Sequence, residues 1–133
     1  MLFRSEAVAR RVGLAVVYLV APTTPPKRRR TIAERSGGFL YCVSLVGVTG
    51  ARASLPSDVA RLVRDVRAAS PVPVGVGFGV SRPAHVRALA KAGADGVIVA
   101  SALVDALGTE GRDVASLARL VRSLREAGAT LVA

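Results

Sequence analysis

Two segments with small residues follow apolar runs and have the residue types that bind phosphate. The first is Gly77-Phe78-Gly79-Val80-Ser81 and the second is Ala100-Ser101-Ala102. Glycine lets a ligand approach backbone N–H groups closely, and a helix that begins at each segment adds free donors and the positive end of its dipole. Each segment alone is equally compatible with a tight turn. Their occurrence after consecutive apolar runs predicts a phosphate site.

A third polar segment, residues 44–52, is long for a connection between a strand and a helix. Gly47 and Gly50 have the freedom of hinges, and Thr49 supplies a hydroxyl, so the segment is interpreted as a loop that closes over a substrate. The alternative is a surface connection. Tyr41 lies in the preceding apolar run; it contacts a substrate if it points inward and is a core residue otherwise.

A sheet is needed to bring these segments together. Along the chain, apolar runs typical of strands alternate with amphipathic patterns typical of helices. Strands are predicted over 15–20, 39–44, 73–77 and 95–100, and helices over 3–12, 26–36, 56–69, 82–92, 101–107 and about 111–127. Thr24 and Ser81 are expected to cap the helices that follow them. The alternation predicts an α/β fold with parallel strands. Four β-α units suit either a small open sheet or half of a closed barrel.

The bulk composition bounds the size and the partners of the chain. Its 133 residues fit one domain and are about half of the roughly 250 that a complete (β/α)8 barrel needs. The net charge is +10, but only Lys27–Arg30 forms a basic run. The other arginine groups recur every three residues, which is typical of solvated helix faces: Arg61, Arg64, Arg67, and Arg119, Arg122, Arg125. We therefore expect no nucleic-acid partner.

Cysteine usage and hydropathy bear on the location. The single cysteine, Cys42, cannot form an intrachain disulfide and favours a reducing compartment. The N-terminus has no apolar signal core, and the longest apolar run, residues 14–22, is too short to cross a bilayer. We expect a cytoplasmic protein without membrane association. With 51% hydrophobic but only 4% aromatic residues, its core should consist of Val, Leu and Ala.

An ordered series of motifs is more specific than any of these features. Along the chain come Leu19-Val20-Ala21-Pro22-Thr23-Thr24, Phe39-Leu40-Tyr41-Cys42-Val43-Ser44, Gly47-Val48-Thr49-Gly50-Ala51-Arg52, Val76-Gly77-Phe78-Gly79-Val80-Ser81, and Ala94-Asp95-Gly96-Val97-Ile98-Val99 with Ser101-Ala102. The series resembles the tryptophan synthase α chain family in order and spacing, over nearly the whole chain. The resemblance implies that residues 1–133 form a single partial domain, the C-terminal half of a TIM (β/α)8 barrel.

The resemblance also implies an activity. The family cleaves indole-3-glycerol phosphate to indole and glyceraldehyde 3-phosphate, a retro-aldol lyase step that needs no metal or cofactor. Indole then passes to a β chain, which uses pyridoxal phosphate, in an α2β2 type of complex. The roles implied for this chain are a phosphate contact by Gly50, Gly77, Gly79 and Ser101, a substrate-facing Tyr41, a pocket-lining Phe78, and Thr49 on the closing loop.

Two positions depart from the family pattern. Ala100 stands where the family usually has glycine, so its methyl group either crowds the phosphate or is harmless if the backbone angles suit alanine. Leu45 stands where the family often has arginine, which removes one polar contact.

The catalytic groups are the larger departure. The reaction needs a general acid and a base, and in this family a Glu and an Asp from the first half of the barrel supply them. We expect their strands to precede Met1, and the nine acidic residues present do not replace them. Asp95 is expected at the strand end away from the site, His85 on an exposed helix, and Cys42 in the core. The chain alone is therefore predicted to be inactive.

Four functional hypotheses follow. The first is a fragment of the α-type lyase that retains the phosphate site, and the second is a non-catalytic half-barrel that binds a phosphorylated ligand or a partner chain. Two open sheet edges favour self-association in the second case. The third, an isomerase or epimerase of sugar phosphates, is disfavoured by the Gly-Val-Thr-Gly loop. The fourth, nucleic-acid binding through the arginines, predicts strongly salt-dependent association.

Overall fold

A four-stranded parallel sheet forms the centre of the chain. The computed structural model describes residues 3–44, 57–77 and 79–129. The strands are β1 (Leu19–Val20), β2 (Leu40–Val43), β3 (Val74–Gly77) and β4 (Gly96–Ile98), and they lie side by side in chain order. All three neighbouring pairs are parallel, as the sequence predicts.

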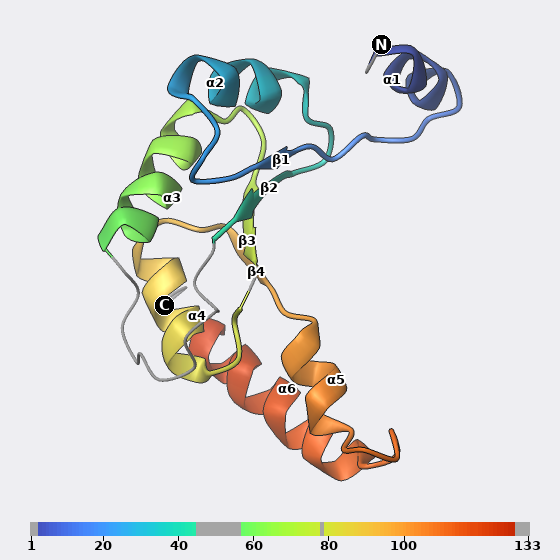
Figure 1. Cartoon of the computed structure of the whole chain (residues 1–133), viewed down its shortest axis with the longest axis vertical. Coiled ribbons are helices and arrows are strands. Elements are labelled where there is room, and N and C mark those ends of the chain that lie inside the picture. Colours follow the sequence, from blue (N-terminus) through green and yellow to red (C-terminus); the bar gives the residue numbers. More distant parts are fainter. Residues whose placement is uncertain (1–2, 45–56, 78, 130–133) are drawn as a thin grey trace.

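Helices cover one side of this sheet. They are α1 (Phe3–Arg11), α2 (Pro26–Arg35), α3 (Ser57–Ala69), α4 (Pro83–Lys91), α5 (Ser101–Ala106) and α6 (Val114–Ala129). The ribbon is a crescent with α2, α3 and α4 along its outer side, and with α1 and the α5–α6 turn at its two tips (Figure 1). This is a partial α/β barrel, in agreement with the fold expected from the sequence.

The register of the strands separates the two faces of the sheet. One row across it is Leu19, Tyr41, Gly75 and Gly96, and the next is Val20, Cys42, Val76 and Val97. Because side chains alternate along a strand, the two rows point to opposite faces. The second row faces the helices, where Val20, Cys42 and Val76 are at most 1% exposed.

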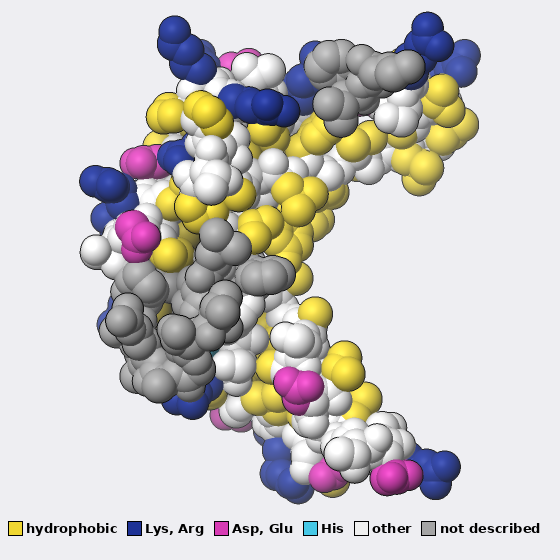
Figure 2. All heavy atoms as spheres, in the orientation of Figure 1, with side chains coloured by type: hydrophobic (Ala, Val, Ile, Leu, Met, Phe, Trp, Pro, Cys, Tyr) yellow, Lys and Arg dark blue, Asp and Glu magenta, His cyan; other side chains and the backbone are white. Residues whose placement is uncertain are grey.

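The first row faces the hollow of the crescent. Its edge residue Leu19 is 58% exposed, although it neighbours the fully buried Val20. The space-filling view shows hydrophobic side chains lining this hollow between the two tips (Figure 2). Parallel sheets are usually covered on both faces, so the concave face is the incomplete part of this structure.

The core between sheet and helices has the composition that the sequence predicts. It contains valine, leucine and small residues, with Leu40, Val63 and Leu89 among the fully buried side chains. The exposed residues of α3 and α6 include both predicted arginine groups, which confirms their solvated faces. No helix among the described residues is long and apolar enough to cross a membrane.

A buried carboxylate attaches α1 to the rest of the chain. Glu6 is only 4% exposed and accepts hydrogen bonds from the Tyr18 hydroxyl at 2.9 Å and from Arg35 Nη2 at 2.9 Å. Arg35 Nε donates a further bond to the same oxygen at 3.1 Å, and Arg10 pairs with the other carboxylate oxygen at 2.7 Å. The local sequence pattern predicts a helix that contains Glu6 but does not predict this cluster.

Both predicted helix caps are wrong. Pro25 occupies the N-cap position of α2, while the Thr24 hydroxyl accepts a hydrogen bond from Ala21 N at 3.0 Å and closes the preceding turn. Arg82 occupies the N-cap position of α4 without a side-chain cap, and Ser81 N donates to His85 Nδ1 at 3.3 Å. A histidine ring one turn into the helix therefore accepts the bond from the backbone that precedes α4.

The prediction of an exposed His85 is also wrong. Its side chain is buried, at 8% exposure, because α6 packs along α4 and covers that face. Cys42 lies in the core at 0% exposure, as predicted. The first strand is shorter than the predicted 15–20, because only Leu19 and Val20 pair with β2 in the ladder.

Candidate functional site

The ends of β2 and β3 are joined by a buried serine. Ser44, at 0% exposure, follows the last residue of β2. Its backbone N–H donates to the Gly77 carbonyl at 2.9 Å, and its hydroxyl donates to the same oxygen at 3.0 Å. These two bonds fix where the chain leaves the sheet toward residues 45–52, so Ser44 positions the start of the predicted loop. Ser44 belongs to one of the family-like motifs, but its residue type and position alone indicate no role.

Gly77 lies directly against Tyr41. A Cβ added to Gly77 would overlap the Tyr41 hydroxyl and would lie 3.0 Å from Cβ of Ile98. Gly75, two residues earlier on the same face, has similar neighbours, because a Cβ there would lie 3.2 Å from the Phe39 ring. The glycines of β3 therefore make room for the aromatic rings of the adjacent β2 segment. The Tyr41 ring lies on the concave face, and its contact with a substrate stays a prediction.

Gly79 has a backbone conformation that favours glycine. Its φ is 72°, in the left-handed region that other residues rarely adopt. The chain turns here between the end of β3 and the start of α4, so the N–H groups of this turn lie at the same end of the sheet as Ser44.

The second phosphate segment begins α5 as predicted. Ala100 is the N-cap residue, and α5 starts at Ser101 with no side-chain cap hydrogen bond. The φ of Ala100 is −133° and its ψ is −74°. These angles lie outside the left-handed region that favours glycine and also outside the main α and β regions. The choice between the two alternatives for Ala100 therefore stays a prediction.

The sheet register brings these residues to one end of the sheet. Val43, Gly77 and Ile98 are partners across β2, β3 and β4. The carboxyl ends of these parallel strands thus lie together, and the segments that contain Gly79 and Ser101 leave from neighbouring strands. Three further residues assigned to the site, Thr49, Gly50 and Phe78, lie outside the described residues, as do Leu45 and Gly47.

The titratable groups near the strands are few. No residue within the four strands is acidic, and neither are the residues that directly follow them, Ala21, Ser44, Phe78 and Val99. Asp95 lies at the opposite end of the sheet, where its Oδ2 accepts a bond from Val74 N at 2.8 Å and pairs with Arg67. Burial raises the pKa of the Cys42 thiol to about 11, although nearby Arg29 lowers it. This sheet end therefore offers backbone donors and hydroxyls rather than an acid–base pair.

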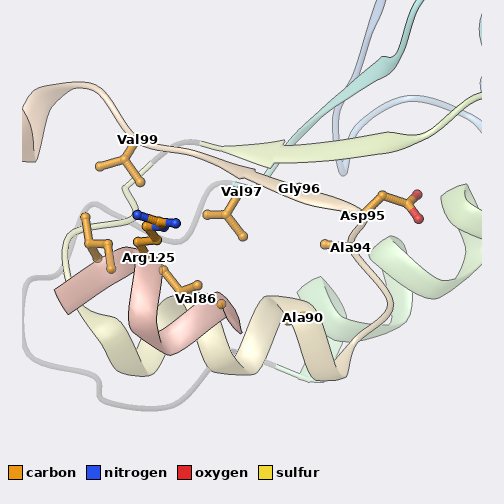
Figure 3. A pocket seen from close by; sticks show the side chains of 10 residues that line it. Val86, Ala90, Ala94, Asp95, Gly96, Val97, Val99 and Arg125 are labelled. Atoms are coloured by element: carbon orange, nitrogen blue, oxygen red, sulfur yellow. The ribbon is translucent and has the colours of Figure 1, made fainter. Parts of the chain in front are cut away.

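Two cavities in the described part of the chain lie away from these segments. One, of about 370 Å³, is a groove along the outer edge of β4 between α4 and α6, lined by Val86, Val97, Leu124 and Arg125 among others (Figure 3). The other, of about 500 Å³, lies between α2 and α3. No group of three or more metal-binding side chains occurs among the described residues.

Residues 4–132 match the model of the family described as tryptophan synthase alpha chain. The chain belongs to the tryptophan synthase alpha chain family. The resemblance inferred from the motifs is thereby confirmed, and the partial barrel is part of the barrel of this family.

Individual relatives agree with this assignment. The tryptophan synthase alpha chain of Gloeobacter violaceus is 49% identical over 121 residues, which are 90% of this chain and 44% of the relative. That of a Picosynechococcus species is 50% identical over 117 residues, or 86% and 44%. A structure of the tryptophan synthase α2β2 complex from Pyrococcus furiosus is similar with a TM-score of 0.79 at 40% identity, and the match covers 94% of this chain and 50% of that one. The chain thus spans about half the length of these relatives.

Proposed function

We propose that this chain supplies the phosphate-binding half of a tryptophan synthase α-type lyase, which cleaves indole-3-glycerol phosphate to indole and glyceraldehyde 3-phosphate. Membership of the family is the observation that carries the proposal. The arrangement of Gly77, Gly79 and Ser101 at one end of neighbouring strands supports it, because barrels often bind phosphate with two adjacent loops and the start of a short extra helix.

In this proposal the residues of the chain bind and position the substrate, but they do not transfer protons. Backbone N–H groups near Gly50, Gly77, Gly79 and Ser101 bind the phosphate, while Tyr41 and Phe78 contact the substrate and Thr49 lies on the closing loop. Ala100 begins the short helix without preventing the contact. The general acid and base come from the half of the barrel that the chain does not match, so these 133 residues alone release no indole. No metal or cofactor is assigned to the chain.

The partner in this proposal is a tryptophan synthase β chain. The support is that the solved relative from Pyrococcus furiosus is an α2β2 complex. Pyridoxal phosphate would belong to that β chain. The pairing is expected only when the barrel is complete, because the other half contributes to its surface.

Calorimetric titration with indole-3-glycerol phosphate or glyceraldehyde 3-phosphate tests the site. We expect the chain to bind both esters and Gly79→Asp to abolish binding, because the aspartate adds bulk and negative charge beside the phosphate. Gly93→Asp is the matched control, since Gly93 also has a positive φ, of 100°, but follows α4 at the other end of the sheet. Equal binding by the chain and by Gly79→Asp would contradict the site assignment.

An activity assay tests the missing chemistry. The purified chain should release no indole, whereas a mixture with the unmatched first half of the Gloeobacter relative should release it. The same mixture made with Gly79→Asp should be inactive. Indole release by the chain alone would disprove the division of roles, and an inactive wild-type mixture would count against the lyase proposal.

A further inference from the structure

The two tips of the crescent carry most of the exposed large hydrophobic side chains. We call residues 3–20 the N-terminal arm and residues 101–114 the C-terminal arm. Six of the seven such side chains among the described residues lie on the arms: Val8, Val12, Leu14, Leu19, Val104 and Val114, each between 50% and 66% exposed. Exposed apolar groups gathered at two separate places indicate surfaces that another chain covers.

The arms also carry opposite charge. The N-terminal arm contains Arg4, Arg10 and Arg11 against Glu6, a net charge of +2. The C-terminal arm contains Asp105, Glu110 and Asp113 against Arg112, a net charge of −2, in a chain whose total is +10. In the space-filling view blue side chains lie at the α1 tip, whereas magenta and blue side chains lie together at the α5–α6 tip (Figure 2). Each arm is therefore complementary to the other arm of a second copy.

The two outer edges of the sheet are also complementary to those of a second copy. Strands β1 and β4 each have one neighbour, so each presents one unpaired edge, and both run in the same direction. A twofold axis along the strands would place β4 of one copy beside β1 of the other and would do the same on the far side. Two sets of four parallel strands would then form an eight-stranded closed sheet, in which no edge is left open and side chains fill the interior.

The exposed area supports an interface of this size. The chain exposes 8703 Å², whereas a compact monomer of 13.7 kDa exposes roughly 6,600 Å². The excess of about 2,000 Å², to which residues outside the described ranges also contribute, is comparable to what one subunit buries in an obligate dimer. The groove beside β4, lined by Val97 and Arg125 among others, is a further concave surface at this edge of the sheet (Figure 3).

We propose that two copies of this chain associate through their arms and sheet edges into a closed, eight-stranded barrel with twofold symmetry. The proposal is argued only from the concave face, the edges and the arm charges. It competes with the lyase proposal for this surface, because the unmatched half of a barrel would cover the same face and edges. It commits to a second copy because the four strands are half of a closed set and because the charges of the two arms are opposite.

Sedimentation equilibrium of the purified chain between about 5 and 200 µM tests the association. The expected species has twice the mass of the 13.7 kDa chain. A folded monomer at all concentrations overturns the proposal, and so does a series of larger oligomers, because a closed pair has no free edge. A monomer that forms a 1:1 complex only with the unmatched half of a relative would also overturn it and would assign the concave face to that half.

A charge-exchange experiment tests the arms. Arg4→Glu with Arg11→Glu should weaken the dimer roughly tenfold or more, and Asp105→Lys with Glu110→Lys should do the same, because like charges then face each other. All four changes together should restore the affinity. Arg64→Glu with Arg87→Glu, exposed residues on α3 and α4, is the control and should leave the dimer unchanged. Absence of rescue by the fourfold variant would refute the pairing of the arms.

A cross-link tests the neighbouring edges. Leu19→Cys and Gly96→Cys place thiols in the same row of the concave face, on the outermost strands. Closing a sheet into a barrel staggers the joined edges, so the two thiols lie near each other but not directly opposite. Mixing the two single variants with a long bismaleimide should therefore give a cross-linked pair of chains. A control that replaces Leu19→Cys by Arg64→Cys should give none. Equal cross-linking in both mixtures would contradict the pairing of β1 with β4.

Discussion

At the scale of single residues, Gly77 has two separate reasons to be glycine. A side chain would collide with Tyr41, and the same residue is assigned to the phosphate site. A substitution of Gly77 therefore disturbs packing and binding together, whereas Gly79 sits in a turn where its positive φ, rather than a packed ring, limits the residue type. Gly79 is for this reason the better probe of the ligand site, and Gly77 the better probe of the sheet.

Gly77→Ala is expected to destabilise the fold by about 1–3 kcal/mol, because the new methyl group overpacks against the Tyr41 hydroxyl. Chemical denaturation followed by circular dichroism measures this. Tyr41→Phe in the same chain should recover part of the loss, because it removes the oxygen in the clash. Gly128→Ala is the control, since a Cβ there meets only Val86 at 3.7 Å, and it should be neutral or stabilising in helix α6. Equal losses in both variants would contradict the packing argument.

Cys42 is expected to be unreactive in the folded chain. Its side chain is fully buried, and burial raises the pKa of its thiol to about 11, so only about one thiol in a thousand is ionised at pH 8. Titration with a thiol-specific chromogenic disulfide should show no reaction without denaturant and one thiol per chain with it. Fast reaction under native conditions would show that the sheet opens or that α2 and α3 do not cover it.

Residue types and spacing predict which segments belong to the proposed site, but they do not predict how individual polar atoms are partnered. Thr24 and Ser81 have the sequence positions of caps, yet each is displaced by an interaction with another part of its turn. His85 looks exposed from its own helix alone, and only the packing of α6 along α4 buries it. The buried carboxylate of Glu6 is paired with Arg35, which is 29 residues away in the sequence. Such pairings depend on tertiary contacts that local patterns do not contain.

At the scale of elements, α1 is held chiefly by one carboxylate. The hydrogen bonds from Arg35 hold the pKa of Glu6 below its ordinary value, with Tyr18 and Arg10 contributing in the same direction and burial opposing them. When folding lowers the pKa of a carboxyl group, its stabilising effect is fully present at pH values above the pKa that the group has in the unfolded chain. This stabilisation is lost as the pH falls through the folded pKa, so the attachment of α1 should weaken on the acid side.

Glu6→Gln should loosen α1 at neutral pH, and acidification below about pH 4.5 should do so in the unmodified chain. Amide hydrogen exchange, corrected for its intrinsic pH dependence, should show lost protection in α1 but not in α3. Glu34→Gln is the matched control, because Glu34 forms an exposed pair with Arg30 on α2. Unchanged protection of α1 in Glu6→Gln would show that its attachment rests on other contacts.

The order and type of the elements were predictable, because strands that are apolar throughout alternate with amphipathic helices. The length of β1 was not. Residues 15–20 are apolar throughout, but only Leu19 and Val20 form the ladder. The residues before them bond to the neighbouring segment at isolated points: Gly37 N donates to the Val16 carbonyl, Tyr41 N to the Tyr18 carbonyl, and Tyr18 N to the Ser36 hydroxyl. A strand with no neighbour on its outer side pairs only where its one partner runs alongside it. Hydropathy does not report the presence of that neighbour.

At the scale of the whole molecule, the structure has a core on one side of its sheet only. Helices bury the row that contains Cys42 and Val76, while the row that contains Leu19 and Tyr41 faces a hollow. The relatives are about twice as long as the match, which is consistent with a barrel that needs as much chain again. The phosphate-binding assignment concerns the strand ends and turns. The interface assignment concerns the edges and the concave face, on which Tyr41 and Gly77 also lie.

If two chains together close one barrel, thermal stability should depend on protein concentration. The melting temperature of the chain should rise with protein concentration, because dissociation accompanies unfolding and mass action favours the folded pair. A tandem chain, in which a second copy follows the first through a Gly/Ser linker of about 20 residues, should melt at a temperature that is independent of concentration. Such a linker spans roughly 25 Å on average, enough to connect neighbouring copies.

The tandem chain with Arg4→Glu and Arg11→Glu in both copies should melt at a lower temperature than the unmodified tandem chain, because each copy contributes both arms to the closure. The tandem chain with Arg64→Glu and Arg87→Glu should melt as the unmodified tandem chain does. Calorimetry at two concentrations separates these cases. A single chain whose melting temperature does not change with concentration would mean that the 133 residues reach their full stability without a second copy, and the concave face would then be a stable surface rather than half of an interface.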